Sequence, residues 1–363
     1  MQNKMILLFF ILGAVFFCLF FSEGLQEVER EKPAAEERAA EEEQAAKTDG
    51  TGKQTEGPVE ITISALKGPS GIGMVRLLEE TPAYGRDVKG EYRIAGSPDV
   101  LVSRLLSEEV DIATLPTNIA VKLYNKGVPY RFGAVTGFGL LYLLSRDPGV
   151  MGIEDLEGKD VYNIGRGATP DFMFRYLLSE LGIDPVEDVA VRFTYGHPEL
   201  AKMLIAGKVE TGVLPEPFVT QVLMKSDDVR IAADFQRLWR QVQEGAEAGV
   251  DTGSGPSYPM TCVVIREDLL EDRPEAVKVF LDSYRSSIEW VKANPEQAGK
   301  LSEKHGIGMP APVAEAAVPR LNLAFVPGSE AKEMMNRYLQ VLLDFDPDSI
   351  GGKLPNDRFY AGK

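Results

Sequence analysis

The chain has 363 residues, of which 44% are hydrophobic and 26% charged, and its formal net charge is −16. This composition is typical of a soluble globular protein, and the acidic balance argues against nucleic acid as a partner, because phosphate binding needs a basic surface. The only cysteines are Cys18 and Cys262 and there are two histidines, which excludes an internal disulfide or a cysteine zinc cluster in the body of the protein.

The N-terminal segment is an apolar run from Met5 to Phe21. As a helix it would be about 25 Å long, which is short for a hydrocarbon core of ~30 Å and long for a signal-peptide core. Three interpretations follow: cleavage after Gly24, a lipoprotein with Cys18 as the lipidation candidate, or a retained anchor. Residues 1–24 are therefore a predicted signal peptide or membrane or lipid anchor, and each interpretation places the body outside the cytoplasmic membrane.

Residues 25–58 are rich in Glu and Ala and then in Thr, Gly, Lys and Gln. They contain almost nothing to bury, so we predict a disordered acidic tether.

The body begins with a predicted strand at Val59–Leu66, where apolar residues alternate. Lys67–Gly71 follows as a glycine-containing turn before a helix, and such a turn either exposes backbone N–H groups to a ligand or simply connects the two elements. A second strand is predicted at Tyr92–Ala95.

A pattern of helix, buried strand and helix then runs from Gly96 to Lys126 and recurs from Gly196 to Lys225. In the first copy Ser97 is expected to cap a helix, residues 110–115 form a short apolar strand, and Pro116 ends it. The offset of 100 residues, from position 96 to position 196, is too long for a solenoid repeat and predicts duplication of a lobe.

Two stretches are predicted to cross between the lobes. The first is the strand Tyr130–Val135, a glycine-flanked turn with Phe138, and the apolar run Leu140–Ser145. The second is the return strand Tyr258–Ile265, in which Cys262 is expected to be a small buried hydrophobe. Amphipathic patterns then predict helices over the ranges 273–294, with Trp290 in the core, and 329–345.

The second lobe is predicted to start with a short helix at Ile153–Lys159 and a strand at 161–164. The loop Gly165–Pro170 imitates a dinucleotide fingerprint, but Pro170 stands where the third glycine belongs, so we reject a nucleotide site. The loop is still suited to a small ligand, because Arg166 supplies several donors and Thr169 is expected to cap the following helix.

Three stretches resemble the type II periplasmic binding proteins of ABC importers, in the nitrate/sulfonate/taurine and thiamine-precursor branch. They are LLSEEVDIATLPTNIAVKLYNKG, IEDLEGKDVYNIGRGATPDFMFRYLLSELGI and LAKMLIAGKVETGVLPEPF. The resemblance implies an α/β fold of two lobes, each a mainly parallel sheet flanked by helices, joined by two crossing segments. Lobe 1 is expected to comprise residues 59–140 and 259–363, and lobe 2 residues 141–258.

The resemblance further implies an extracytoplasmic receptor, periplasmic and in some interpretations membrane-anchored. It would act as a monomer, capture a small organic molecule in the interlobe cleft and deliver it to ABC permease and ATPase subunits. No enzyme activity, metal or cofactor is expected. A ligand-sensing receptor on the same fold is one alternative; a thiamine-pyrimidine-synthase-like enzyme is another, disfavoured because the chain lacks a cysteine cluster.

Ligand contacts are expected at turns that follow a strand and precede a helix, and at nearby aromatic residues, because ligands of open sheets lie beyond the carboxyl ends of the strands. Arg166 and Lys67 would suit an anion, whereas Glu216, a surface acid or a cleft residue, would suit an amine or a pyrimidine-like heterocycle. The expected ligand-binding residues are Lys67, Gly68, Pro69, Ser70, Gly71, Ser97, Thr117, Asn118, Phe138, Arg166, Gly167, Thr169, Glu216, Phe218 and Tyr258.

Overall fold

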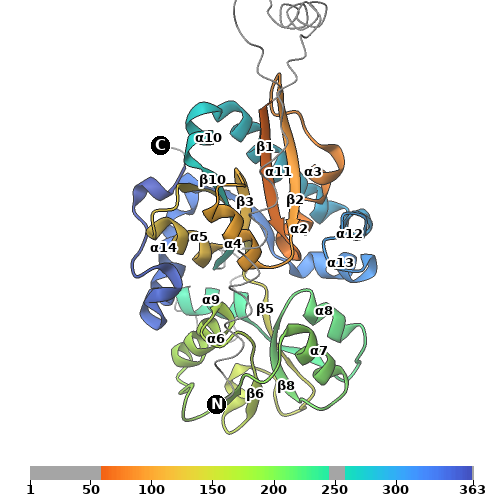
Figure 1. Ribbon diagram of the computed structural model, residues 1–363. Helices are drawn as coiled ribbons and strands as arrows, with labels where there is room; N and C mark the ends of the chain where they lie inside the picture. Colours follow the sequence, from red (N-terminus) through yellow and green to blue (C-terminus); the bar gives the residue numbers. More distant parts are fainter. Residues whose placement is uncertain (1–58, 245–257, 362–363) are drawn as a thin grey trace, which may run out of the picture. The chain divides into compact units, whose positions relative to one another are not determined.

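The computed structural model describes residues 59–244 and 258–361, which form a mixed α/β fold with two sheets (Figure 1). The chain divides into units 1–57 and 58–363, and all elements below belong to the second unit. The predicted signal peptide or anchor, its Cys18 and the predicted tether lie outside the described residues. Within the described ranges, no helix has the length and apolar character needed to cross a membrane.

The first sheet has the strand order β11-β4-β10-β3-β1-β2. β1 pairs in parallel with β2 and β3, whereas β10 runs antiparallel to both β3 and β4, and β11 runs antiparallel to β4. The strands are β1 Val59–Leu66, β2 Val88–Ala95, β3 Ile112–Pro116, β4 Tyr130–Phe138, β10 Pro259–Arg266 and β11 Leu323–Pro327.

The second sheet has the order β7-β6-β8-β5-β9. β6 pairs in parallel with β7 and β8, and β5 runs antiparallel to β8 and β9. The strands are β5 Leu141–Ser145, β6 Asp160–Tyr162, β7 Ala190–Arg192, β8 Thr211–Pro215 and β9 Arg230–Asp234.

Both sheets repeat one arrangement, which accounts for the repeat in the sequence. The order β2-β1-β3-β10-β4 corresponds to β7-β6-β8-β5-β9, and in each the fourth strand runs against its neighbours. Helix α4 (Pro98–Leu106) precedes β3, and α7 (His197–Ile205) precedes the equivalent strand β8. The reversed strands β10 and β5 are the ones reached by the crossings between lobes.

Helices cover both faces of the first sheet. One face packs in a core with Ile61, Ile63, Phe280 and Tyr284, and the other in a core with Leu115, Phe132 and Met335 that continues into the second lobe. In Figure 1, α12 and α13 lie to the right of this sheet and α5 and α14 to its left. The first face carries α2 Pro69–Gly73, α3 Val75–Glu80, α11 Pro274–Ala293, α12 Pro295–Lys304 and α13 Ala311–Ala317; the second carries α4, α5 Thr117–Asn125 and α14 Gly328–Phe345.

The helices of the second lobe divide in the same way. Those that share the continuous core with α14 contribute Phe174 and Trp239, and those on the other face pack around Leu200 and Val219. The first pair is α6 Thr169–Glu180 and α9 Phe235–Glu244; the second is α7 and α8 Phe218–Leu223. The remaining elements are α10 Glu267–Asp272 and the 3₁₀ turns η1 Ile153–Leu156, η2 Val318–Arg320, η3 Pro347–Ile350 and η4 Asp357–Phe359.

Two interpretations of single residues are confirmed. Cys262 is fully buried in β10, and this burial raises the pKa of its thiol to about 12, so the thiol stays protonated. Trp290 packs, half-buried, against the core of the first sheet, as the helical spacing of its apolar neighbours predicts.

Several predicted element boundaries were wrong, including the start of β2, which lies at Val88 and not at Tyr92. The expected turn Lys67–Gly71 becomes helical from Pro69 onward, because proline is favoured at the first helical position. The glycine-flanked stretch before Gly139 continues β4 as far as Phe138, which leaves a crossing of only two residues, and the expected helix at 153–159 is one 3₁₀ turn.

Asp111, directly before β3, ties three strands of the first sheet together. Its carboxylate accepts the Thr62 N–H at 2.6 Å and pairs with Arg266 at 2.8 Å, while burial raises its pKa above the ordinary value.

A raised carboxyl pKa adds stability that grows as pH falls through the folded-state pKa and is complete below the unfolded value. We therefore expect wild type to gain unfolding free energy relative to Asp111→Asn as the pH falls from 7 to 4. Urea titrations across that range measure it, and a constant difference would contradict it.

Candidate ligand-binding site

The carboxyl ends of the forward strands of both sheets meet at the crossing between them. In the first sheet the end of β3, Pro116, pairs with Thr261, and the end of β4, Phe138, pairs with Pro259 at the start of β10. In the second sheet the end of β8, Pro215, pairs with Leu141 at the start of β5. Only two residues separate the end of β4 from the start of β5, so the two edges face each other across that point. Ligands of open α/β sheets bind at such edges.

Backbone hydrogen bonds fix this crossing on both sides. Gly139 N–H donates to the Tyr258 carbonyl at 3.0 Å, which joins the first crossing to the second. Phe138 N–H donates to the Asn322 carbonyl at 3.0 Å, and the Asn322 side chain donates to the Gly139 carbonyl at 2.6 Å. The predicted residues Phe138 and Tyr258 are thus brought together, and Asn322, which no sequence pattern indicated, holds them there.

Thr117 and Asn118 open helix α5 directly after β3. Thr117 is fully buried, and its hydroxyl lies against the Cys262 thiol without a well-aligned hydrogen bond. Asn118 is half-buried. No side chain caps this helix, so its first N–H groups are not satisfied by a side chain. A helix start whose N–H groups lack a side-chain cap is an arrangement that a ligand with acceptor oxygens satisfies.

The loop before α6 places Gly165 and Gly167 at φ +61° and +68°, a conformation that favours glycine. Gly167 N–H donates to the Asp171 carboxylate at 3.0 Å. Arg166 is exposed, with its guanidinium 4.6 Å from the centre of the Phe193 ring. The loop therefore lies at the edge of the second sheet, while the Arg166 side chain is engaged with an aromatic ring.

Thr169 and Ser97 are correctly placed at helix starts, but neither acts as the expected cap. Thr169 is the first residue of α6 rather than its cap, and its hydroxyl lies 3.5 Å from that of Tyr338 on α14. Ser97 occupies the cap position of α4, yet its side chain makes no capping hydrogen bond. The capping expectation was wrong for both, and both helices begin without a side-chain cap.

Backbone hydrogen bonds and close packing hold the Lys67–Gly71 segment: Lys67 N–H donates to the Ala95 carbonyl and Gly68 N–H to the Ile307 carbonyl, both at 3.0 Å. Lys67 is exposed, and Gly68 has φ +99° with open space around it. A Cβ at Gly71 would lie 2.8 Å from the Leu66 carbonyl oxygen, so glycine is needed there for close approach. Pro69 and the buried Ser70 start the five-residue helix α2.

Glu216 forms an ion pair that joins the two lobes. It follows β8, its side chain is completely buried, and its Oε1 accepts from Arg320 Nε at 2.5 Å. Thr220 donates its N–H and its hydroxyl to the same carboxylate at 3.1 and 3.0 Å, and Arg320 also donates to the Thr220 hydroxyl. The Tyr142 hydroxyl of β5 donates to the Arg320 carbonyl at 3.2 Å. Both oxygens of the Glu216 carboxylate thus have protein partners. Phe218, two residues further on, is half-buried against the His197 ring.

Tyr258 lies at the centre of an aromatic cluster between the lobes. Its ring stacks on Tyr338 at 5.7 Å and meets Trp239 edge-on at 5.6 Å, and its hydroxyl donates to Gln236 Oε1 at 2.9 Å. Gln236 Oε1 also accepts Leu141 N–H, while its buried Nε2 has no partner among the described residues. Burial raises the pKa values of Tyr258 and Tyr338, so both hydroxyls remain neutral donors.

Arg320, Gln236 and Tyr338 are the residues of this region that the sequence did not reveal. Gln236 and Arg320 lie in stretches for which no element was predicted, and Tyr338 lies in the predicted helix 329–345, where nothing distinguishes it from core residues. Of these residues, only Arg320 has a position in the sequence that could have drawn attention to it, because it follows Pro319 shortly before the last strand. That signal is weak.

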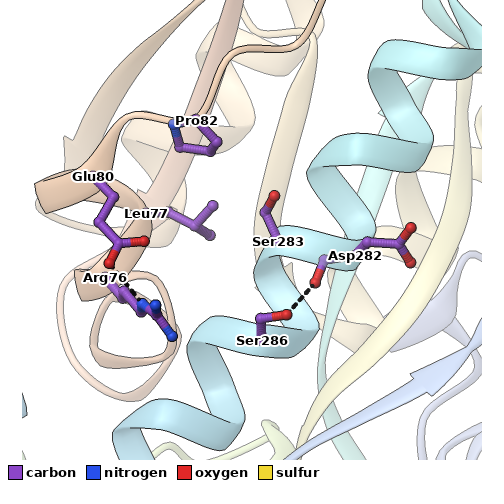
Figure 2. Close-up of a pocket in the computed structure, with 7 residues that line it drawn as sticks. All are labelled: Arg76, Leu77, Glu80, Pro82, Asp282, Ser283 and Ser286. Atoms are coloured by element: carbon purple, nitrogen blue, oxygen red, sulfur yellow. Dashed lines mark hydrogen bonds and ion pairs between the residues drawn. The ribbon is translucent and has the colours of Figure 1, made fainter.

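A separate hollow of about 350 Å³ lies between α3 and α11 (Figure 2). Arg76 pairs with Glu80 at 2.9 Å, and Ser286 donates to the Asp282 carbonyl at 3.0 Å, so these groups satisfy one another. Both helices pack on a face of the first sheet rather than at its carboxyl edge. The facing edges therefore remain the candidate site. Among the described residues, no group of three or more His, Cys, Asp or Glu is placed to hold a metal ion.

Two sheets of repeated topology, joined by two crossings with their carboxyl edges facing, define the type II periplasmic-binding-protein fold. Residues 74–313 match the family model described as "ABC transporter, phosphonate, periplasmic substrate-binding protein", and the chain belongs to this family. It is thus a solute receptor of the ABC importer class, which implies an extracytoplasmic location, a small-molecule ligand, and permease and ATPase partners. The family consists of transporter binding proteins rather than enzymes. No curated protein sequence matches the chain.

Solved structures agree with this assignment. An ABC transporter protein from Parabacteroides distasonis is 28% identical, with a TM-score of 0.71 over 84% of this chain and 99% of that one. The aliphatic sulphonate binding protein SsuA from Escherichia coli is 14% identical, with a TM-score of 0.60 over 84% and 95%. The nitrate-binding protein NrtA from Synechocystis PCC 6803 is 14% identical, with a TM-score of 0.56 over 80% and 84%. The last two show likeness of fold alone.

Proposed function

We propose that this protein captures a small molecule bearing acceptor oxygens between the facing sheet edges and delivers it to an ABC permease. The observation that carries the proposal is the set of helices α4, α5 and α6, which start at these edges without side-chain caps. Their first N–H groups would donate to a bound acceptor, and the helix dipole favours negative charge there.

The comparisons support the same ligand chemistry. The names of the family and of SsuA and NrtA refer to phosphonate, sulphonate and nitrate, which all present acceptor oxygens. In this chain the half-buried Asn118 adds a donor and an acceptor at the start of α5, and the half-buried rings of Phe138 and Phe218 are suited to cover an organic body. A small organic oxyanion suits both features better than a cation, because the buried carboxylate of Glu216 is already paired with Arg320.

The proposed mechanism is closure around the ligand. The first sheet and its helices rotate against the second about the two-residue crossing at Gly139, and closure forms the surface that the permease recognises. Delivery requires no bond to be made or broken in the receptor.

Native mass spectrometry of protein purified from its own host identifies the ligand that co-purifies. With that ligand, Thr117→Val and Asn118→Ala are each expected to weaken affinity at least tenfold, roughly 1.4 kcal/mol, as measured by calorimetry. The melting temperature of the ligand-free protein should change little, because valine has nearly the shape of threonine and the Thr117 hydroxyl makes no well-aligned hydrogen bond.

The matched control is Ser329→Ala, which alters an exposed residue in the first turn of α14, away from the facing edges. It should leave affinity unchanged. If Thr117→Val and Asn118→Ala bind as tightly as wild type, the ligand does not contact the start of α5 and the proposed site is wrong.

A further inference from the structure

A second cavity, of about 470 Å³, lies beside the crossing. The cavity lies next to β11, the edge strand beside β4. In the strand order, β3 and β1 lie towards the other edge of the sheet. The volume is within the range of roughly 300 to 1,000 Å³ that small-molecule pockets occupy. The lining residues are Phe138, Arg240, Lys292, Pro295, Val318, Pro319, Asn322, Leu323 and Ala324.

The charge of this cavity is positive although the protein is strongly acidic. Arg240 of α9 and Lys292 in the last turn of α11 line it, and the described part of the chain contributes no aspartate or glutamate to the lining. The Nε of Arg240 is buried and has no hydrogen-bond partner among the described residues. The planar donors of a guanidinium that lines a cavity match a carboxylate or a similar oxyanion.

Asp234, an acid whose charge acts on Arg240, is already occupied. The Asp234 carboxylate accepts the backbone N–H groups of Gln236 and Arg237 at 2.8 and 3.3 Å, at the start of α9. It lowers the local positive potential without forming an ion pair with Arg240 in the described structure.

The remaining wall is apolar. Phe138, Val318 and Leu323 face the cavity together with two prolines. A bare inorganic anion would leave this wall exposed to water, whereas an anion with a short apolar body would cover it. We propose that this cavity binds a small amphipathic organic anion, with its charged group at Arg240 and Lys292 and its apolar body against Phe138 and Leu323.

Such a ligand would act on the crossing itself. Two of the lining residues, Phe138 and Asn322, are hydrogen-bonded to each other, and Asn322 also holds Gly139. The occupant would contact α9 of the second lobe and α11 of the first, so its binding favours one angle between the lobes. This site is separate from the helix starts of the proposed function, and it stands or falls independently of them.

Hexanoate serves as the probe, with uncharged hexanamide as its matched control. In the full chain at constant ionic strength, we expect hexanoate to raise the melting temperature saturably and hexanamide to have no such effect. Arg240→Gln and Lys292→Gln are each expected to weaken the apparent affinity for hexanoate at least tenfold. Lys300→Gln, an exposed residue of α12 paired with Glu296, should not alter it.

Lys292 is itself exposed, so its variant folds independently of any effect at Arg240. The proposal is overturned if hexanoate gives no saturable shift in wild type, or if both variants bind it like wild type. It is also overturned if Thr117→Val abolishes the shift while Arg240→Gln preserves it, because the probe then occupies the facing edges instead.

Discussion

Arg320→Met is expected to lower the free energy of unfolding by about 2 to 3 kcal/mol and to open the two lobes. Removing one partner of a buried ion pair leaves the other charge without compensation, which costs about 3 to 5 kcal/mol when both are buried. Here the Glu216 side chain is completely buried, but that of Arg320 is 31% exposed, so we expect the lower part of that range or less. Chemical denaturation measures the stability, and small-angle X-ray scattering measures the increase in the radius of gyration.

The lobes are expected to open because the Glu216–Arg320 ion pair joins one lobe to the other. Arg320 belongs to η2, which precedes a strand of the first sheet, and Glu216 follows a strand of the second. Water reaches an unpaired Glu216 carboxylate only if the lobes separate, so the lost ion pair favours the open form. Ligand affinity should fall for the same reason, because closure must then bury an unpaired charge.

Two further variants separate this explanation from a general loss of packing. Adding Glu216→Gln to Arg320→Met should restore part of the stability, because the amide removes the buried charge and can still accept from Thr220. Arg337→Met breaks an exposed pair with Glu333 and should change stability little. If Arg320→Met destabilises no more than Arg337→Met, the interlobe ion pair does not hold the lobes together.

The elements that sequence analysis predicted well are those with a local signal. The boundaries of β1 coincide with the apolar alternation of Val59–Leu66, and α11 and α14 end within a residue of their amphipathic patterns. The repeat between positions 96 and 196 indicated the shared topology of the sheets, because each copy places a helix before the strand that pairs with a reversed neighbour. The predicted lobe boundaries and ligand contacts stay predictions.

Contacts across the lobes have no comparable signal in the sequence. Glu216 and Arg320 are 104 positions apart, and Thr169 and Tyr338 are 169 apart. Either residue of such a pair is locally compatible with a surface position, and only the tertiary fold decides that they meet. The same applies to helix capping at Ser97, since a suitable residue type does not fix the side-chain conformation.

Gly139→Ala is expected to destabilise the protein by about 3 kcal/mol, near the upper end of typical overpacking effects. A Cβ at this position would lie 2.1 Å from Cζ of the Tyr258 ring. That ring cannot move aside easily, because it is fully buried between Tyr338 and Trp239 and hydrogen-bonded to Gln236. The backbone at this position is not in the left-handed region, so the effect is a steric one at the crossing and not a strained φ. Thermal or urea denaturation measures the loss.

A control and a rescue make this result specific to the contact with Tyr258. Gly96→Ala places a Cβ where no atom lies within 4 Å, so stability should stay the same or rise slightly because the unfolded chain loses freedom. In a Tyr258→Ala background the new methyl group enters the space left by the ring, so Gly139→Ala should then cost far less than in wild type. If Gly139→Ala lowers the free energy of unfolding equally in both backgrounds, the two-residue crossing does not depend on close approach to Tyr258. Another constraint then selects glycine there.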